Sequence, residues 1–301
     1  MKLLTYRIEQ KNRLGVLSKD EEWVFPLKSM GVDYEDMLEL VKGIGESEKQ
    51  LIDYMLDKYA DAPYSVPGAA RLEDIAIEAP IISPGQDIIC LGINYMAHAE
   101  ESARYKNENF DGTREYPVYF SKRVNRATAC GEEIPSHKDI TDRLDYEVEL
   151  AVIIGKEANG VSPEEAEEYV FGYTIMNDIS ARDIQYRHKQ WYYGKSLDKC
   201  APMGPWIVTR ESLPYPPKLS VQSKVNGELR QDSNTSLMIF GISYVVSELS
   251  QGMTLLPGTI ISMGTPAGVG MGFDPPRLLQ PGDEVECIIE GIGCLKNKIG
   301  D

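Results

Sequence analysis

The stretch LDYEVEL, Leu144 to Leu150, alternates apolar or aromatic residues with acids. Successive side chains of a β-strand point to opposite faces, so this pattern predicts a strand. One face would then carry three acids: Asp145, Glu147 and Glu149. Carboxylates two residues apart on a strand are separated at their bases by about 7 Å, which allows both to reach one cation. An ordinary exposed, charged strand face explains the same stretch equally simply.

The size and charge of the chain exclude several classes of function. Its 301 residues suffice for one main domain with a smaller appendage and a sizeable core. The net charge of −16 argues against nucleic acid or an anionic membrane as the main partner. The N-terminus resembles no signal peptide, and no apolar run approaches the roughly 20 residues of a membrane span. We therefore expect a soluble, cytoplasmic protein.

Five cysteines are scattered along the chain, at positions 90, 130, 200, 287 and 294. None belongs to a CxxC pair, and their number is odd. This usage predicts free thiols in a reducing compartment.

The first part of the chain predicts a small N-terminal domain, residues 1–75, before a larger domain at 76–301. Short strand-like runs up to about residue 25 precede helical spacing over 34–59. The stretch 60–72, ADAPYSVPGAARL, is rich in Pro, Ala and Gly and is typical of a linker.

Strand patterns dominate the larger domain, as in DIICLGI, PVYFSK, YVFGYTIMND and TIISMG. Two helices are expected: one in SPEEAEEYV, with Ser162 as its N-cap and Pro163 at its first position, and one near 239–253. Regular strand–helix alternation is missing, so a Rossmann or (β/α)8 fold is not expected. The sequence predicts a β-rich α+β fold.

A further acid, Asp178, follows the apolar run YTIMN and should lie near the end of a strand. Together, Glu147, Glu149 and Asp178 would form an all-oxygen site for Mg²⁺ or Mn²⁺. The alternative is a ladder of charges neutralised by Arg143 and Arg182.

Other motifs add groups suited to catalysis. His98 and Glu101 are three residues apart, and on a helix they would face each other, so Glu101 could orient the imidazole as a base. Surface histidines beside acids are commoner than such pairs. The loop MGTPAGVG, 263–270, could bring backbone N–H groups to a ligand, although such loops are more often tight turns.

These motifs together resemble the fumarylacetoacetate hydrolase (FAH) family in its shorter bacterial form. The resemblance extends from about Asp87 to Gly293 and rests on five segments in the family's order. They are LGINYMAHAEES, LDYEVELAVIIGKEA, YTIMNDISARDIQYRHKQW, GKSLDKCAPMGPWIVT and the segment from VNGELRQD to MGTPAGVG.

The resemblance implies a role for each matching residue. Glu147, Glu149 and Asp178 match the metal-binding acids, usually for Mg²⁺, and His98 with Glu101 matches the water-activating pair. Catalytic Lys195 and the substrate-contacting residues Lys122, Arg182, Gln185 and Thr265 match as well. The resemblance also implies the family's mixed β-sandwich roll, a homodimer and a 2-oxo acid substrate.

One segment departs from the family pattern. After Lys122 the chain reads RVNR, which suggests that Arg123 or Arg126 faces the pocket and binds a second carboxylate; a solvated basic turn is the alternative. The polar stretch 101–116 is a candidate lid that brings Glu101 into place over bound substrate.

The chemistry implied is cleavage of an acylpyruvate, or 2,4-dioxo acid, to pyruvate and a carboxylic acid. The cation would stabilise an enolate as a Lewis acid, and His98 would deprotonate the attacking water. Decarboxylation of oxaloacetate, isomerisation or tautomerisation, and hydration use the same enolate and stay open. A binder of 2-oxo acids without catalysis is the alternative from another class.

Overall fold

The computed structural model describes residues 1–106, 109 and 112–301. The strands of its large sheet are β1 (Lys2–Ile8), β2 (Lys11–Leu17), β3 (Trp23–Pro26), β4 (Ala70–Arg71), β5 (Ala76–Ile77), β6 (Ile88–Gly92), β7 (Val118–Lys122), β10 (Val148–Ile154), β11 (Val170–Asn177), β13 (Met203–Thr209) and β16 (Ile260–Ser262). A second sheet contains β8 (Glu133–Ile134), β14 (Ser220–Val225), β15 (Glu228–Asn234), β17 (Glu284–Ile289) and β18 (Gly293–Ile299). The helices are α1 (Met37–Gly43), α2 (Glu46–Lys58), α3 (Met96–Lys106), α4 (Arg182–Arg187), α5 (Tyr192–Lys195) and α6 (Ile242–Gly252).

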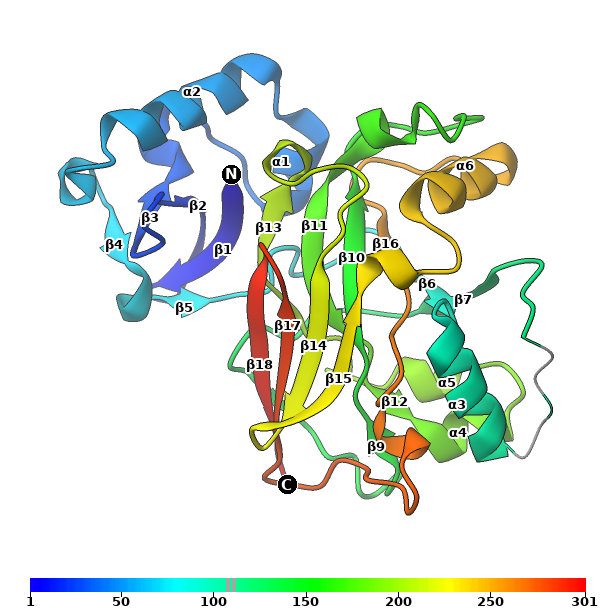
Figure 1. Cartoon of the computed structure of the whole chain (residues 1–301). Coiled ribbons are helices and arrows are strands. Elements are labelled where there is room, and N and C mark those ends of the chain that lie inside the picture. The colour runs from blue at the N-terminus through cyan, green and yellow to red at the C-terminus, as the bar shows by residue number, and fades with distance from the viewer. Residues whose placement is uncertain (107–108, 110–111) are drawn as a thin grey trace.

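The large sheet runs through the whole molecule (Figure 1). Its order is β4-β3-β2-β1-β13-β11-β10-β16-β6-β7, with β5 also paired to β1. The five-stranded sheet, in the order β15-β14-β17-β18-β8, packs against one face. A third, two-stranded sheet joins β9 (Leu144–Asp145) to β12 (Ser180–Ala181). The β-rich α+β fold expected from the sequence is confirmed.

Strand β10 is buried on both faces, and this decides where its acids lie. Its residues Val148, Leu150, Val152 and Ile154 join the core shared with the five-stranded sheet. On the opposite face, Ala151 and Ile153 belong to the core beneath α1 and α2. Every residue from Leu144 to Leu150 is buried, so the interpretation as an exposed charged face is wrong.

The predicted strand through Leu144–Leu150 is interrupted. It ends as β9 at Asp145 and resumes as β10 at Val148, because side chains replace the sheet's backbone partners in between. The N–H of Glu147 donates to Asn177 Oδ1 at 3.0 Å, and that of Val148 to Gln231 Oε1 at 3.1 Å. Asp145 thereby leaves the face on which Glu147 and Glu149 lie.

The N-terminal strands extend the large sheet, since β1 pairs antiparallel with β13. Helices α1 and α2 cover this end (Figure 1). The single helix expected over 34–59 is two helices, because Gly45 breaks it: its N–H donates to the Glu48 carboxylate at the start of α2. A domain boundary at residue 75 stays a prediction.

Of the two helices expected in the larger domain, one is present and the other is not. Helix α6 is confirmed within 239–253. The helix expected after Ser162 is wrong: only a 3-10 turn forms, at Ala166–Tyr169, and the Ser162 N–H donates to Glu165 instead of capping a helix. All five cysteines are free. Among the described residues, no helix has the length and apolar character to cross a bilayer.

Candidate active site

Three buried carboxylates meet where β10 begins and β11 ends. Val148 pairs with Asn177 across the two antiparallel strands, and the Asp178 N–H donates to the Glu147 carbonyl at 2.9 Å. This register brings Asp178 beside Glu147 and Glu149, with one oxygen of each within 4.8 Å of the others. A cluster of oxygen donors of this kind suits a hard divalent cation.

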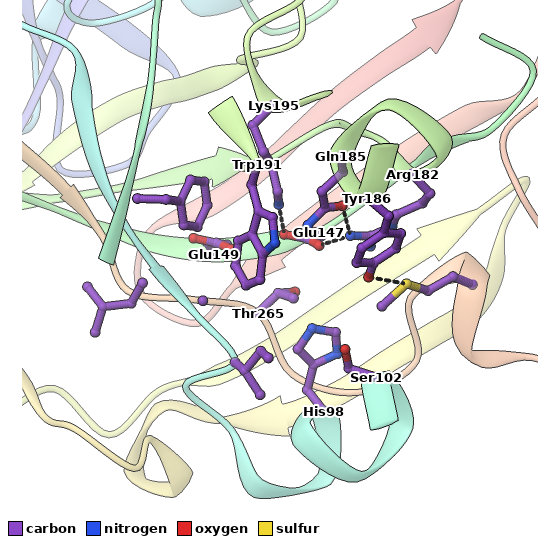
Figure 2. A pocket seen from close by; sticks show the side chains of 15 residues that line it. His98, Ser102, Glu147, Glu149, Arg182, Gln185, Tyr186, Trp191, Lys195 and Thr265 are labelled. Atoms are coloured by element: carbon purple, nitrogen blue, oxygen red, sulfur yellow. Dashed lines mark hydrogen bonds and ion pairs between the residues drawn. The ribbon is translucent and has the colours of Figure 1, made fainter. Parts of the chain in front are cut away.

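Two of the three carboxylates are neutralised by buried cations. Lys195 Nζ lies 2.7 Å from Glu147 Oε2 and 2.6 Å from Asp178 Oδ2 (Figure 2). Arg182 Nη1 lies 2.6 Å from Glu147 Oε1, and Lys122 Nζ lies 2.7 Å from Asp178 Oδ1. The alternative was a charge ladder neutralised by Arg143 and Arg182. Arg182 does pair with Glu147, whereas Arg143 instead donates to the Tyr105 hydroxyl.

Glu149 differs from the other two acids because it has no ion-pair partner among the described residues. It accepts hydrogen bonds from the Ser262 hydroxyl and from the Gly264 N–H at 3.0 Å. Burial, with the charges of Asp178 and Glu147, raises its pKa well above the usual range. Burial acts on Glu147 too, but there Lys195 and Arg182 hold the pKa well below the usual range. A cation bound between the three acids would supply the charge that Glu149 lacks, so the donor set fits a divalent metal.

His98 and Glu101 face each other on α3, as their spacing predicts. His98 Nδ1 lies 2.9 Å from Glu101 Oε2, and both side chains are buried. An ionised carboxylate only accepts, so Nδ1 carries the proton and Nε2 keeps a free lone pair. The other oxygen, Glu101 Oε1, accepts the Gly268 N–H at 2.9 Å, which anchors the pair to the MGTPAGVG loop.

A narrow cavity connects these groups (Figure 2). Its volume of about 20 Å³ is close to the room that one ordered water needs. Seven of the ten residues selected from the sequence line it: His98, Glu147, Glu149, Arg182, Gln185, Lys195 and Thr265. The remaining three stand behind this lining. Glu101 contacts His98. Asp178 accepts hydrogen bonds from Lys122 and from Lys195, and of these two lysines Lys195 lines the cavity whereas Lys122 does not.

Lys122 does not line the cavity, although the resemblance suggests a pocket lysine. Its Nζ also donates to the Ile179 carbonyl at 2.8 Å, and the side chain is fully buried. It is placed to hold Asp178 in position. Substrate contact by Lys122 finds no support in this geometry.

Neither arginine of the RVNR segment faces the cavity. Arg126 pairs with Glu132 and, at 3.1 Å, with Glu78. Arg123 is 60% exposed and lies 3.8 Å from Asp87. The hypothesis that either one binds a second carboxylate in this pocket is wrong. Part of the suggested lid, residues 107–108 and 110–111, lies outside the described residues.

Sequence reasoning missed eight further lining residues: Leu91, Gly92, Ile93, Ser102, Phe120, Tyr186, Trp191 and Met271. Helical spacing was a signal for Ser102, which is one turn after His98 on α3. No such signal marked Phe120 or Met271, because their positions depend on how distant strands and loops pack.

Asp145, the first acid of the opening stretch, organises this wall without joining the metal ligands. Arg182 Nε donates to Asp145 Oδ2 at 2.9 Å. The N–H groups of Gly270 and Met271 donate to the same carboxylate at 2.6 and 2.9 Å. Asp145 therefore ties the loop after Thr265 to Arg182.

Comparison with known proteins defines the class to which this fold and site belong. Residues 87–300 match the family model described as Fumarylacetoacetate (FAA) hydrolase C-terminal. The chain therefore belongs to the fumarylacetoacetate hydrolase family. The relatives that it resembles include a tautomerase, isomerases and hydrolases.

Three relatives show the range of this family. Over 308 residues, 100% of both chains, the protein is 41% identical to oxaloacetate tautomerase YisK of Bacillus subtilis (strain 168). A fumarylacetoacetate hydrolase from Exiguobacterium antarcticum is 36% identical with a TM-score of 0.82, covering 100% of this chain and 99% of that one. Maleylpyruvate hydrolase from Sphingobium sp. SYK-6, in complex with manganese(II) and pyruvate, is 25% identical with a TM-score of 0.76 over the same shares.

Proposed function

We propose that this protein is a divalent-metal-dependent tautomerase that interconverts the keto and enol forms of oxaloacetate or a 2-oxo dicarboxylic acid of similar size. The observation that carries the proposal is the His98–Glu101 pair facing the carboxylate trio across a very small cavity. The full-length likeness to an oxaloacetate tautomerase supports the same reaction.

Glu147, Glu149 and Asp178 would hold the cation, for which Mg²⁺ or Mn²⁺ are the proposed candidates. When bound, such a cation supplies Lewis-acid stabilisation of negative charge on a 2-oxo oxygen. The residues around it then bind and orient the acid.

Arg182 and Lys195 supply the positive charge for substrate binding. Both are almost fully buried, and Arg182 Nη2 has no hydrogen-bond partner among the described residues, so it is available to a substrate carboxylate. Gln185 lies beside Arg182, with Oε1 3.1 Å from Nη1, and fixes the guanidinium. Thr265, which donates to the Val148 carbonyl, lines the side of the cavity nearest the loop.

His98 carries the proton in this reaction. Its free Nε2 takes a proton from C3 of the keto acid, and the C–H electron pair becomes the C2=C3 double bond. The same nitrogen then returns the proton to the 2-oxo oxygen, which completes the enol. Glu101 holds Nδ1–H throughout and stabilises the imidazolium that forms in between.

Hydrolysis of an acylpyruvate, the reaction first expected from the sequence, is the second candidate. In it, His98 Nε2 would take its proton from water, and that water would attack C4. The likeness to maleylpyruvate hydrolase favours this route. We rank it second because this chain is 25% identical to the maleylpyruvate hydrolase but 41% identical, over the full length of both chains, to the oxaloacetate tautomerase.

The test follows the enol of oxaloacetate by its ultraviolet absorbance, with Mg²⁺ or with EDTA. A parallel assay measures pyruvate released from oxaloacetate and from an acylpyruvate. Wild type, His98→Ala and His137→Ala are compared, because His137 contacts the Asp198 carbonyl and does not line the cavity. We expect metal-dependent tautomerisation that falls by about 100-fold in His98→Ala and stays unchanged in His137→Ala.

The two assays separate the candidates. Pyruvate from the acylpyruvate, without faster enol conversion, would establish the hydrolase instead. Pyruvate from oxaloacetate alone would identify a decarboxylase. A homodimer remains a prediction from the family resemblance, and a cytoplasmic location remains a prediction from the sequence. The choice between Mg²⁺ and Mn²⁺ stays open.

A further inference from the structure

Apolar and aromatic side chains line part of the cavity, and Trp191 is the largest of them. Figure 2 shows Trp191 among the lining residues, together with Lys195, Glu149 and His98. Trp191 directly precedes α5, the short helix that ends at Lys195. Trp191 therefore lies close in sequence to Lys195, one of the cations of the site.

Three elements hold the indole in place. A Cβ atom added to Gly92, the last residue of β6, would lie 2.3 Å from Trp191 Cζ3, so the ring packs directly on the backbone there. Phe120 of β7 meets the ring edge to face at a centroid distance of 5.2 Å. Lys106 Nζ, from α3, lies 6.0 Å from the ring centroid. The indole is thus supported by the sheet and by the helix that carries His98.

The charged groups fix which end of a ligand reaches the indole. The cation that the three acids would hold, together with Arg182 and Lys195, would bind the 1-carboxylate and 2-oxo groups of a 2-oxo acid. The group on C3 then extends toward the rest of the lining, where Gly92, Phe120 and Trp191 lie beside the polar Ser102 and Tyr186. The indole occupies space that a larger group on C3 would need.

We propose that Trp191 is the residue that limits the size of the group carried on C3 of the substrate. The inference rests on the proposed 2-oxo acid chemistry and adds the residue that sets the size limit of the substrate. Steric limits of this kind are strong in a close-packed pocket, where one methylene changes discrimination by about 10–200-fold.

The test measures binding rather than turnover. Mn²⁺-loaded protein is titrated calorimetrically with oxalate, which has no C3 group, and then with pyruvate, 2-oxobutanoate, 2-oxohexanoate and phenylpyruvate. In wild type, we expect affinity to fall by about tenfold or more from pyruvate to the bulkiest acids. In Trp191→Ala the fall should shrink to less than about threefold, with Trp191→Phe between the two and oxalate affinity unchanged.

Two further variants make the test directional. Gly92→Ala forces the indole to shift, because an added Cβ would lie 2.3 Å from Trp191 Cζ3, so it should alter the size profile while affecting oxalate least. Tyr192→Ala is the matched control, because Tyr192 is the next residue, is 41% exposed and does not line the cavity. Its size profile should equal that of wild type.

The outcomes distinguish failure of this inference from failure of the proposed function. Normal oxalate binding with an unchanged size profile in Trp191→Ala, Trp191→Phe and Gly92→Ala would overturn the role of Trp191 and leave the proposed function standing. Loss of oxalate binding in the folded Trp191 variants would also overturn it, since the ring would then position the site. No oxalate binding to loaded wild type would remove the proposed function and this inference with it. If Trp191→Ala fails to fold, Trp191→Phe and Gly92→Ala decide the question.

Discussion

The two chemically active walls of the cavity are built in different ways. The acids and their partners Lys122, Lys195 and Arg182 form a network that is buried among strands of the large sheet and the short helices beside it. His98 and Glu101 lie on α3, and a hydrogen bond from the Gly268 N–H links Glu101 to the rest of the site.

This difference separates binding from proton transfer. The sheet wall holds charge, and its groups also stabilise the fold, because buried ions are costly when they lose a partner. The helix wall holds one imidazole and one carboxylate, whose loss disturbs few neighbours. Substitutions in the sheet wall should therefore affect metal binding and stability together, whereas those in the helix wall should affect turnover alone.

The largest effect is expected for Asp178→Asn. The change removes one of the three acids proposed to bind the metal and leaves Lys122 without the only carboxylate that it contacts among the described residues. We expect Mn²⁺ affinity to fall by at least about 100-fold and the free energy of unfolding to fall by about 3–5 kcal/mol. Calorimetry with Mn²⁺ and urea unfolding measure the two quantities. Glu100→Gln, at an exposed position of α3, should change neither.

His98→Ala should give the opposite pattern. We expect kcat to fall by about 100- to 1000-fold because the proton acceptor is lost. Mn²⁺ affinity and thermal stability should remain close to wild type, since His98 contacts neither lysine. Steady-state kinetics and Mn²⁺ titration of the same preparation measure both. A large loss of metal affinity in this variant would contradict the separation of the two walls.

The pH dependence of metal binding should reveal the proton on Glu149. Its raised pKa means that the metal-free protein holds a proton that must leave when a cation binds. Below that pKa, Mn²⁺ affinity should rise by up to about tenfold per pH unit. Calorimetry in buffers with different ionisation enthalpies should show the release of one proton, and equal heats in all buffers would rule this out.

The same groups set the stability of the metal-free protein in opposite directions. The folded state keeps the Glu149 proton at pH values where the unfolded chain has lost it, so this residue makes stability fall as pH rises above the usual glutamate pKa. Glu147, with its lowered pKa, contributes stability above that usual value and loses it on acidification. Unfolding of Glu149→Gln should lack the first of these effects.

The smallest effect is expected for Gly272→Ala. A Cβ there would lie 1.8 Å from Glu101 Oε1, so the carboxylate must shift away from its position. We expect kcat to fall by about tenfold through misorientation of His98, with Mn²⁺ affinity unchanged. Gly241→Ala is the matched control, because nothing lies within 4 Å of its added Cβ. Equal activity in both variants would show that Glu101 tolerates displacement.

Local patterns in the chain were sufficient for much of this description. The alternation of Val148 to Ile154 marked the central strand, and the spacing of His98 and Glu101 marked their contact on α3. Such features depend on neighbours within one turn or one strand, which the order of residues specifies directly. The same reasoning failed at Gly45 and Ser162, where a single capping or turn hydrogen bond ended or prevented a helix.

The family and the cluster of Glu147, Glu149 and Asp178 were readable in the sequence, because motif order and side-chain chemistry do not depend on exact distances. Three other features required the folded chain. Asp145 was diverted to the Met271 loop, Arg126 was paired with Glu132 far from the acids, and Trp191 was placed in the lining of the cavity. Each results from contacts between segments distant in sequence. Charge pairing and packing across those contacts decide which of several acids, such as Asp145 or Glu147, joins the cluster.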